Sequence, residues 1–219
     1  MLKSYVIRTG RYTTAQRKAY DTLSDAYLVD FQEEKLDFKK IFGNTNGVTM
    51  EIGFGSGLAT AAIAEANPDK NYLGIEVHRP GIGRLLWEIE KRSLSNIRII
   101  EHDAVHVTEK MIPESSLEAI HVFFPDPWPK KRHHKRRLMQ RPFTERLAAC
   151  LKSGGYLYMV TDWEDYALHA LEELGACSAL RNAYEGFAPP QSWRPVTRFE
   201  QKGLAKDHAI RELYFVKEA

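Results

Sequence analysis

Apolar residues form short runs that alternate with longer stretches of helix-like spacing through the middle of the chain. The apolar runs predict strands at 48–52, 71–77, 97–101, 117–124 and 156–161. The stretches between and after them predict helices at 58–66, 81–94, 104–111, 142–151 and 163–174. Helices placed between successive strands are typical of a parallel sheet with right-handed crossovers. We therefore expect an α/β fold with a mostly parallel, doubly wound sheet.

The two ends of the chain depart from this alternation. Thr13 or Thr14 can cap a helix that runs to about Leu28, and a turn-rich cluster follows at 43–47. We interpret residues 1–45 as a basic N-terminal extension packed on a main domain of residues 46–219. Near the other end, 177–182 and 211–217 predict strands, and the long irregular segment 183–210 separates them. A loop of that length in a compact domain is usually functional.

Composition limits the class of protein. The 219 residues, 43% hydrophobic and 27% charged, are ordinary for one soluble domain. A net charge of +2 excludes a histone-like protein, so any attraction to nucleic acid has to come from local clusters of cations. No apolar run approaches the ~18 residues that span a bilayer. Cys150 and Cys177 lack CxxC spacing and are expected to be buried, reduced thiols, so we expect a cytoplasmic protein with no membrane partner.

Residues 123–138 read F-F-P-D-P-W-P-K-K-R-H-H-K-R-R-L. Prolines fix the backbone around Asp126 and Trp128, so this carboxylate can be aimed from a rigid loop. The run that follows is basic and includes Lys130, Arg132, His133, His134, Lys135, Arg136 and Arg137. Such a run predicts a surface for a polyanion, although a solvated, charged loop remains an alternative.

The first predicted strand ends in E-I-G-F-G-S-G, with Glu51 before the three glycines Gly53, Gly55 and Gly57. Glu76 ends the second strand, where a carboxylate can accept both hydroxyls of a ribose. The third glycine comes one residue earlier than in the dinucleotide pattern G-x-G-x-x-G. A preceding acid would repel a pyrophosphate but attract the sulfonium and ammonium of S-adenosylmethionine. The loop favours that methyl donor; a dehydrogenase and a ligand-free turn are the alternatives.

Two further acids end strands. Asp103 follows the third strand and can meet an adenine amino group or cap the next helix, and both roles are compatible. Asp126 follows the fourth and would face the departing methyl group. His102 and His106 are four residues apart, but no HExxH or Cys/His constellation accompanies them, and no metal is expected. G-x-S-x-G and Walker A sequences are also absent, which argues against hydrolases and P-loop enzymes.

Taken together, these motifs are specific. P-D-P-W-P-K-K-R-H-H, E-I-G-F-G-S-G, G-I-E-V-H, T-D-W-E-D-Y-A (161–167), T-R-F-E-Q-K-G (197–203) and R-T-G-R-Y-T-T-A-Q (8–16) resemble the TrmB family of tRNA (guanine-N7-)-methyltransferases. The resemblance implies a class I methyltransferase Rossmann-like fold, with seven strands and an antiparallel C-terminal strand. It also implies methyl transfer from S-adenosylmethionine to N7 of a tRNA guanosine, at position 46 of the variable loop.

The resemblance also assigns roles to residues. Glu51, Gly53, Gly55, Gly57, Glu76, Asp103 and Asp126 would contact the donor, and Asp126 would also be catalytic. Lys130, Asp162, Thr197, Arg198, Phe199 and Glu200 would contact the substrate, and residues 132–137 would contact RNA. Trp128 and Phe199 are both candidates to stack on the target base, with core packing as the alternative.

Alternatives to this interpretation remain. A nucleic-acid-binding module without activity, and a methyltransferase of another RNA or of protein, are the competing interpretations. The oligomeric state, monomer or homodimer, stays open.

Overall fold

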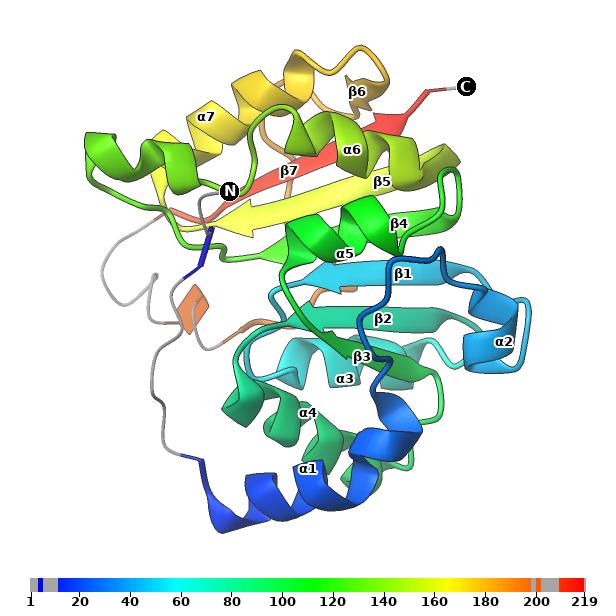
Figure 1. Cartoon of the computed structure of the whole chain (residues 1–219). Helices are drawn as coiled ribbons and strands as arrows, with labels where there is room; N and C mark the ends of the chain where they lie inside the picture. The colour runs from blue at the N-terminus through cyan, green and yellow to red at the C-terminus, as the bar shows by residue number, and fades with distance from the viewer. Residues whose placement is uncertain (1–3, 6–11, 198–199, 202–208, 219) are drawn as a thin grey trace.

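A seven-stranded sheet forms the centre of the computed structural model, which describes residues 4–5, 12–197, 200–201 and 209–218 (Figure 1). The strand order is β3-β2-β1-β4-β5-β7-β6. The strands are β1 (Val48–Ile52), β2 (Asn71–Glu76), β3 (Ile97–Glu101), β4 (Leu117–Phe123), β5 (Leu151–Thr161), β6 (Leu180–Asn182) and β7 (Arg211–Lys217). β1 to β5 pair in parallel, and β7 is antiparallel to both of its neighbours. The order reverses beside β1, which creates the switch point where ligands bind in such sheets.

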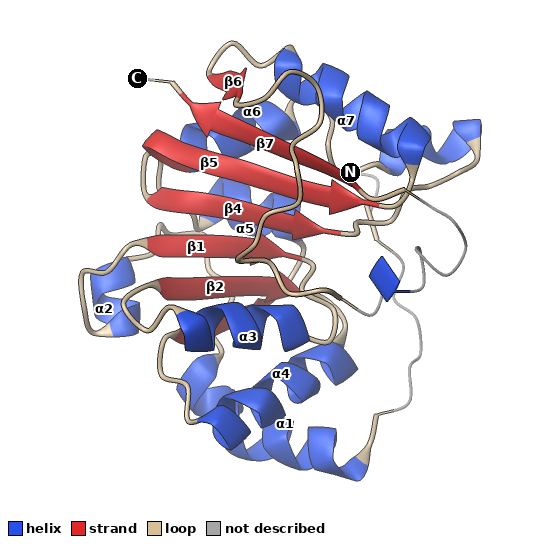
Figure 2. Cartoon of the chain, turned by 180° about the vertical axis from the view of Figure 1, so that it is seen from behind, coloured by secondary structure: helices blue, strands red, loops and turns tan. Residues whose placement is uncertain are grey.

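Helices cover both faces of the sheet, as the alternating pattern predicted. α5 (Ala104–Lys110), α6 (Phe143–Cys150) and α7 (Glu164–Gly175) lie on one face (Figure 1). α3 (Leu58–Ala66) and α4 (Arg79–Arg92) lie on the other (Figure 2). Two separate clusters of buried apolar side chains fill the two layers. The fold is therefore a doubly wound three-layer arrangement.

The N-terminal residues pack on the outside of the second layer. α1 (Thr14–Tyr27) begins at Thr13, whose side chain and that of Gln16 cap the helix reciprocally. α1 lies against α4 at Gly83, where an added Cβ would come within 2.5 Å of the Gln16 carbonyl oxygen. Beyond the helix, Leu28 forms a parallel bridge with Ile99 at the edge strand. The division of the chain near residue 45 stays a prediction.

Some element predictions needed correction. A strand was expected at 156–161, but β5 already begins at Leu151, because Leu151 pairs with Leu117 of β4. The strand expected from residue 177 is reduced to the three residues of β6. Two short elements were not predicted: α2 (Phe38–Phe42) and a 3₁₀ helix, η1 (Lys131–Arg136), within the basic run. Both are too short to give a clear hydrophobic period.

A stretch of irregular chain, residues 183–197, crosses the sheet over β7, β5 and β4 on the face that α3 and α4 cover elsewhere (Figure 2). Trp193 of this stretch stacks on His121 of β4, with ring centroids 4.9 Å apart, and contacts Tyr158 of β5. Burial lowers the pKa of His121 to about 3, so this histidine is a neutral core residue. The irregular stretch thus takes the place of a covering helix.

The remaining global predictions concern cysteines and membranes. Cys150 and Cys177 are both buried and free, as predicted, and burial raises the pKa of the Cys150 thiol to about 11. Among the described residues, none of the helices is long and apolar enough to cross a bilayer.

Candidate active site

A cleft of about 790 Å³ opens at the carboxyl ends of the parallel strands. The residues that directly follow β1, β2, β3 and β4 contribute to its wall. The predicted site residues that line it are Glu51, Gly53, Gly55, Glu76, Asp126 and Thr197. The structure therefore brings together acids that lie 75 positions apart in the sequence, from 51 to 126.

The glycine loop between β1 and α3 forms the floor of the cleft. Gly53 and Gly55 have φ angles of +72° and +59°, and an added Cβ at either would point into open space. The backbone can therefore approach a ligand closely at these two positions. Gly57 differs, because it is not in the cleft wall and an added Cβ there would lie 2.6 Å from the Cβ of Leu85. Gly57 instead allows the loop to pack against α4.

Glu76 is held by main-chain donors. One oxygen of its carboxylate accepts the amide of Gly55 at 2.8 Å, and the other accepts the amides of Val77 at 2.7 Å and His78 at 3.0 Å. Three amide donors fix the position of the carboxylate. This geometry suits a carboxylate that must meet two adjacent hydroxyls.

Glu51 is the most deeply buried acid of the cleft, with 4% of its surface exposed. Burial raises the pKa of Glu51 to about 7, against the opposing effect of a hydrogen bond with Thr60 and with a smaller contribution from the charge of Glu76. Burying a carboxylate without a cationic partner is unfavourable. A bound cation would restore its charge, which fits the sulfonium and ammonium groups of the expected donor.

Asp103 performs the helix-capping role that the sequence allowed. Its Oδ1 accepts the amides of Val105 at 2.8 Å and of His106 at 3.4 Å, at the start of α5. The cleft wall at this point is formed by the flanking His102 and Ala104. Contact between Asp103 and an adenine therefore stays a prediction.

Asp126 lies on the proline-containing loop after β4, exposed and in the cleft wall. Two residues of this loop, Phe124 and Trp128, have positive φ angles of 49° and 48°, which is strained for non-glycine residues. The indole N–H of Trp128 donates to the carbonyl oxygen of Ser4 at 3.0 Å, which brings the start of the chain beside the loop. Trp128 is half-buried, so the structure leaves its stacking on a base as a prediction.

The basic run folds into η1 and presents Lys130, Lys131, Arg132 and Lys135 to solvent. Arg136 lies over the ring of Trp128, 4.8 Å from its centroid, and His133 contacts the same ring edge-on. Desolvation and the surrounding cations lower the pKa of His133. The exposed part of the run has the charge expected of an RNA-binding surface.

Arg137 was predicted to contact RNA, and the structure corrects this. Its side chain is 1% exposed and forms an ion pair with Asp165. It also donates to the carbonyl oxygen of Pro127 at 3.0 Å and lies over the ring of Tyr166. In this structure Arg137 therefore joins the Asp126 loop to α7 and does not face the surface.

The predicted substrate residues are dispersed. Lys130 is exposed and Asp162 half-buried, and neither is in the cleft wall. Thr197 lines the cleft, whereas Glu200 is buried and paired with Arg194. Arg198 and Phe199 lie outside the described residues.

Several residues of the cleft wall were not predicted. Tyr5 and Gln16 come from the N-terminal residues, Arg84 from α4, and Val196 from the irregular segment. They reach the cleft only through packing between distant elements, and the sequence has no local signal for that.

Among the described residues, no group of three or more His, Cys, Asp or Glu side chains could hold a metal ion.

Comparisons with known proteins agree with this geometry. Solved structures with the same fold include the 16S rRNA methyltransferase KamB, with a TM-score of 0.61, 15% identity and coverage of 85% of this chain and 95% of that one. A 16S rRNA (adenine(1408)-N(1))-methyltransferase from Catenulisporales acidiphilia, solved with its cosubstrate SAM, has a TM-score of 0.57, 14% identity and coverage of 84% and 93%. The expected class I methyltransferase fold is thus confirmed.

Sequence relatives are much closer. Residues 45–213 match the family described as "Putative methyltransferase". The tRNA (guanine-N(7)-)-methyltransferase of Nitrosomonas eutropha is 50% identical over 100% of this chain and 97% of its own length. The enzyme of the same name from Ralstonia nicotianae is also 50% identical, over 100% of this chain and 87% of its own length. The chain therefore belongs to the TrmB family of tRNA (guanine-N(7)-)-methyltransferases.

Proposed function

We propose that this protein transfers a methyl group from S-adenosylmethionine to N7 of a guanosine in tRNA, at position 46 in the variable loop. The observation that carries the proposal is a single cleft lined by Glu51, Glu76 and Asp126, together with the exposed basic run that follows Asp126 in the chain. Sequence relatives of the same name support the reaction and the substrate.

The donor end of the cleft fits S-adenosylmethionine, which supplies a methyl group on a sulfonium when bound. Glu76, fixed by three amides, would accept the ribose hydroxyls. Glu51 would pair with the positive charge of the donor. Because burial raises the pKa of Glu51 and disfavours its ionised form, a cationic partner would stabilise this carboxylate. Gly53 and Gly55 let the main chain come close to the ligand. Asp103 remains the proposed contact for the adenine amino group.

The acceptor chemistry needs positioning more than proton transfer. N7 of a neutral guanine carries an in-plane lone pair and no proton, so no strong general base is required. What the protein has to supply is in-line alignment and compensation for the positive charge that arrives on the guanine. Asp126, which lines the cleft, is proposed to give that compensation. Lys130, Asp162 and Thr197 are proposed to hold the nucleotide.

The exposed basic run is proposed to contact the tRNA backbone, through Arg132, His133, His134, Lys135 and Arg136. Electrostatic contacts of this kind position RNA without reading its sequence. The protein would act in the cytoplasm, where tRNA is processed, as a monomer or a homodimer.

Incubation with methyl-labelled S-adenosylmethionine and bulk tRNA tests the proposal. We expect label in tRNA as 7-methylguanosine, mapped to position 46 by cleavage at the modified base. Label at another base, in another RNA, or in protein would replace the proposed substrate. No transfer, with tRNA binding retained, would favour the nucleic-acid-binding alternative.

A further inference from the structure

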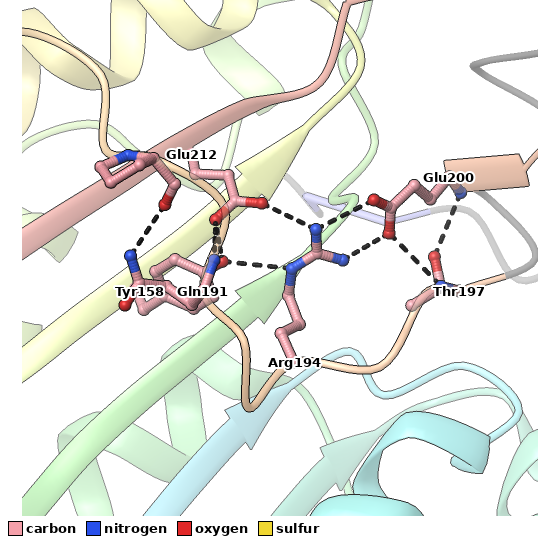
Figure 3. A network of polar contacts seen from close by, with 7 residues as sticks. Tyr158, Gln191, Arg194, Thr197, Glu200 and Glu212 are labelled. Atoms are coloured by element: carbon pink, nitrogen blue, oxygen red, sulfur yellow. Dashed lines mark hydrogen bonds and ion pairs between the residues drawn. The ribbon is translucent and has the colours of Figure 1, made fainter.

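Arg194 is a buried arginine in the irregular segment that crosses the sheet. Its side chain is 4% exposed and connects three elements (Figure 3). Nε donates to the hydroxyl of Tyr158 on β5 at 3.1 Å, and Nη2 donates to Glu212 on β7 at 2.7 Å. Nη1 and Nη2 also bind the two oxygens of Glu200, at 2.5 and 3.0 Å. A planar, bidentate pair of this kind fixes the geometry of both partners.

The carboxylates around Arg194 are fully engaged. Burial opposes the charge of Arg194, but its hydrogen bonds to Glu200 and Glu212 outweigh burial and raise the pKa of Arg194. The same pair lowers the pKa of Glu200 against the effect of burial. Glu212 also accepts the Tyr158 hydroxyl and the amide of Gln191, the latter at 3.2 Å (Figure 3). The hydrogen bonds between Arg194 and Glu200 therefore favour the charged forms of both side chains.

Thr197 and Glu200 have a second, local connection. The amide of Glu200 donates to the Thr197 hydroxyl at 3.1 Å, and the amide of Thr197 donates to the Glu200 carboxylate at 3.4 Å. These reciprocal bonds are those of a helix capping box, S/T-x-x-E. The amide of Gln201 adds a helical bond to the Thr197 carbonyl at 3.0 Å. The two named residues of the T-R-F-E motif therefore shape the backbone of their own segment.

The residues of this segment that face the cleft lie between and directly after the paired Arg194 and Glu200. Pro195, Val196, Thr197 and Gln201 line the cleft, and Val196 is 62% exposed. The anchor points, on β5 and β7, belong to the half of the sheet beyond β4, opposite the donor end at β1 and β2. We call residues 195–197 and 200–201 the acceptor wall. Displacement of Arg194 would therefore move the acceptor wall and leave the donor end, at β1 and β2, in place.

We propose that Arg194 is a positioning residue for the methyl transfer. It holds the acceptor wall, residues 195–197 and 200–201, through its pair with Glu200. In this arrangement Glu200 acts through Arg194 and Thr197 rather than by touching the target nucleotide. The inference rests on the proposed function for its effect on activity, but the structural part can be measured on the free protein.

Hydrogen exchange of the free protein, read by mass spectrometry, tests the anchor. The test variant combines Arg194→Met with Glu212→Gln, so that no unpaired buried carboxylate remains on β7. We expect the amides of Glu200 and Gln201 to exchange about tenfold faster or more, because they lose their anchored partner. Arg146→Met, which breaks bonds to the carbonyls of Thr108 and Ile112 far from the cleft, is the matched control. Unchanged exchange at Glu200 and Gln201 in the folded double variant overturns the proposal.

Kinetics give a second, independent measurement. In the double variant we expect kcat/KM for tRNA to fall on the order of tenfold to a hundredfold, as misplacement of a positioning element does. The dissociation constant of S-adenosylhomocysteine should stay within about twofold of the wild type, since the donor end is untouched. An equal loss of donor affinity would contradict the assignment to the acceptor wall.

Glu200→Gln separates positioning from direct contact. Glutamine retains the capping box and a hydrogen bond to Arg194, so slow exchange at Gln201 and most of the tRNA activity should persist, whereas Glu200→Ala loses both. Normal exchange with lost activity in Glu200→Gln would mean that the carboxylate itself meets the substrate, and the proposal would fail. If the wild-type protein shows no methyl transfer, the proposed function fails, while the exchange experiment still decides the anchor.

Discussion

The two ends of the cleft are held in place by different means. At the donor end, Glu76 is fixed by amides of the adjoining turns, and the glycine loop follows directly from β1. At the acceptor wall, the side chain of Arg194 joins Glu200 to residues of β5 and β7 that are far away in the sequence. Backbone donors tolerate many substitutions around them, whereas a side-chain anchor depends on the identity of each partner. The acceptor wall should therefore be the more easily displaced of the two.

The largest expected effect concerns the point where the two ends meet. Asp126→Ala removes the carboxylate proposed to compensate the charge arriving on the guanine, and kcat should fall on the order of 10²–10³-fold. Affinity for tRNA should change little, because the basic run is intact. Single-turnover rates with saturating donor and tRNA measure the loss of the chemical step.

The control is Asp69→Ala, which removes an exposed acid just before β2, at the end of the strand away from the cleft. This variant should transfer methyl groups at the wild-type rate. Near-normal turnover of Asp126→Ala would remove Asp126 from the catalytic role. The two ends would then have to align donor and base without a charge between them.

The next effect isolates the donor end. Glu76→Ala removes both the proposed ribose contact and the acceptor of three amides, so the KM for S-adenosylmethionine should rise about tenfold to a hundredfold. The KM for tRNA should change less than threefold or so, since the acceptor wall has a separate anchor. Steady-state kinetics with each substrate varied in turn give both values. Equal changes in the two would show that the ends are coupled.

The same contrast explains how far the sequence could be interpreted. The positions of Glu51, Gly53, Gly55 and Glu76 in the cleft wall could be predicted, because they depend on strand ends and on the turn that directly follows β1. The roles of Arg137 and Arg194 were not, since a charge in a basic run or an irregular segment gives no indication of burial or of a partner on another element. The sequence therefore predicted which strand ends form the cleft, while the donor contacts of these residues stay predictions. It did not predict which cations face solvent.

A pH titration sharpens the picture of the donor end. The pKa of Glu51 is raised from 4.5 to about 7 by burial, so the free protein prefers the protonated form below neutral pH. A cationic donor needs the carboxylate, so its binding should be about tenfold weaker at pH 6 than at pH 8. Equilibrium binding of S-adenosylmethionine in Glu51→Gln should be weak and flat with pH. A flat profile in the wild type would contradict the pairing.

The raised pKa of Glu51 also predicts that the free protein loses stability as the pH rises, although donor binding strengthens over the same range. Because the folded pKa of Glu51 lies above its unfolded value, the stabilisation from its protonated form is present below about pH 4.5 and lost as pH rises through about 7. Ionised Glu51 thus costs the free protein about 3 kcal/mol above pH 7. Glu51→Gln should raise the melting temperature at pH 8 and have a much smaller effect at pH 5. No gain at pH 8 would mean that the carboxylate is already paired in the free protein.

The smallest expected effect separates surface charge from internal anchoring within the basic run. Neutralising Arg132, Lys135 and Arg136 together should lower the salt dependence of tRNA binding, by about one unit of slope for each phosphate that the variant no longer neutralises, and weaken binding at low salt. Arg137→Met is the contrast, because this buried arginine pairs with Asp165 and supports the Asp126 loop. It should leave the slope unchanged but lower the melting temperature and kcat. If Arg137→Met lowers the slope as the triple variant does, Arg137 reaches the RNA in the complex, and its pair with Asp165 opens on binding.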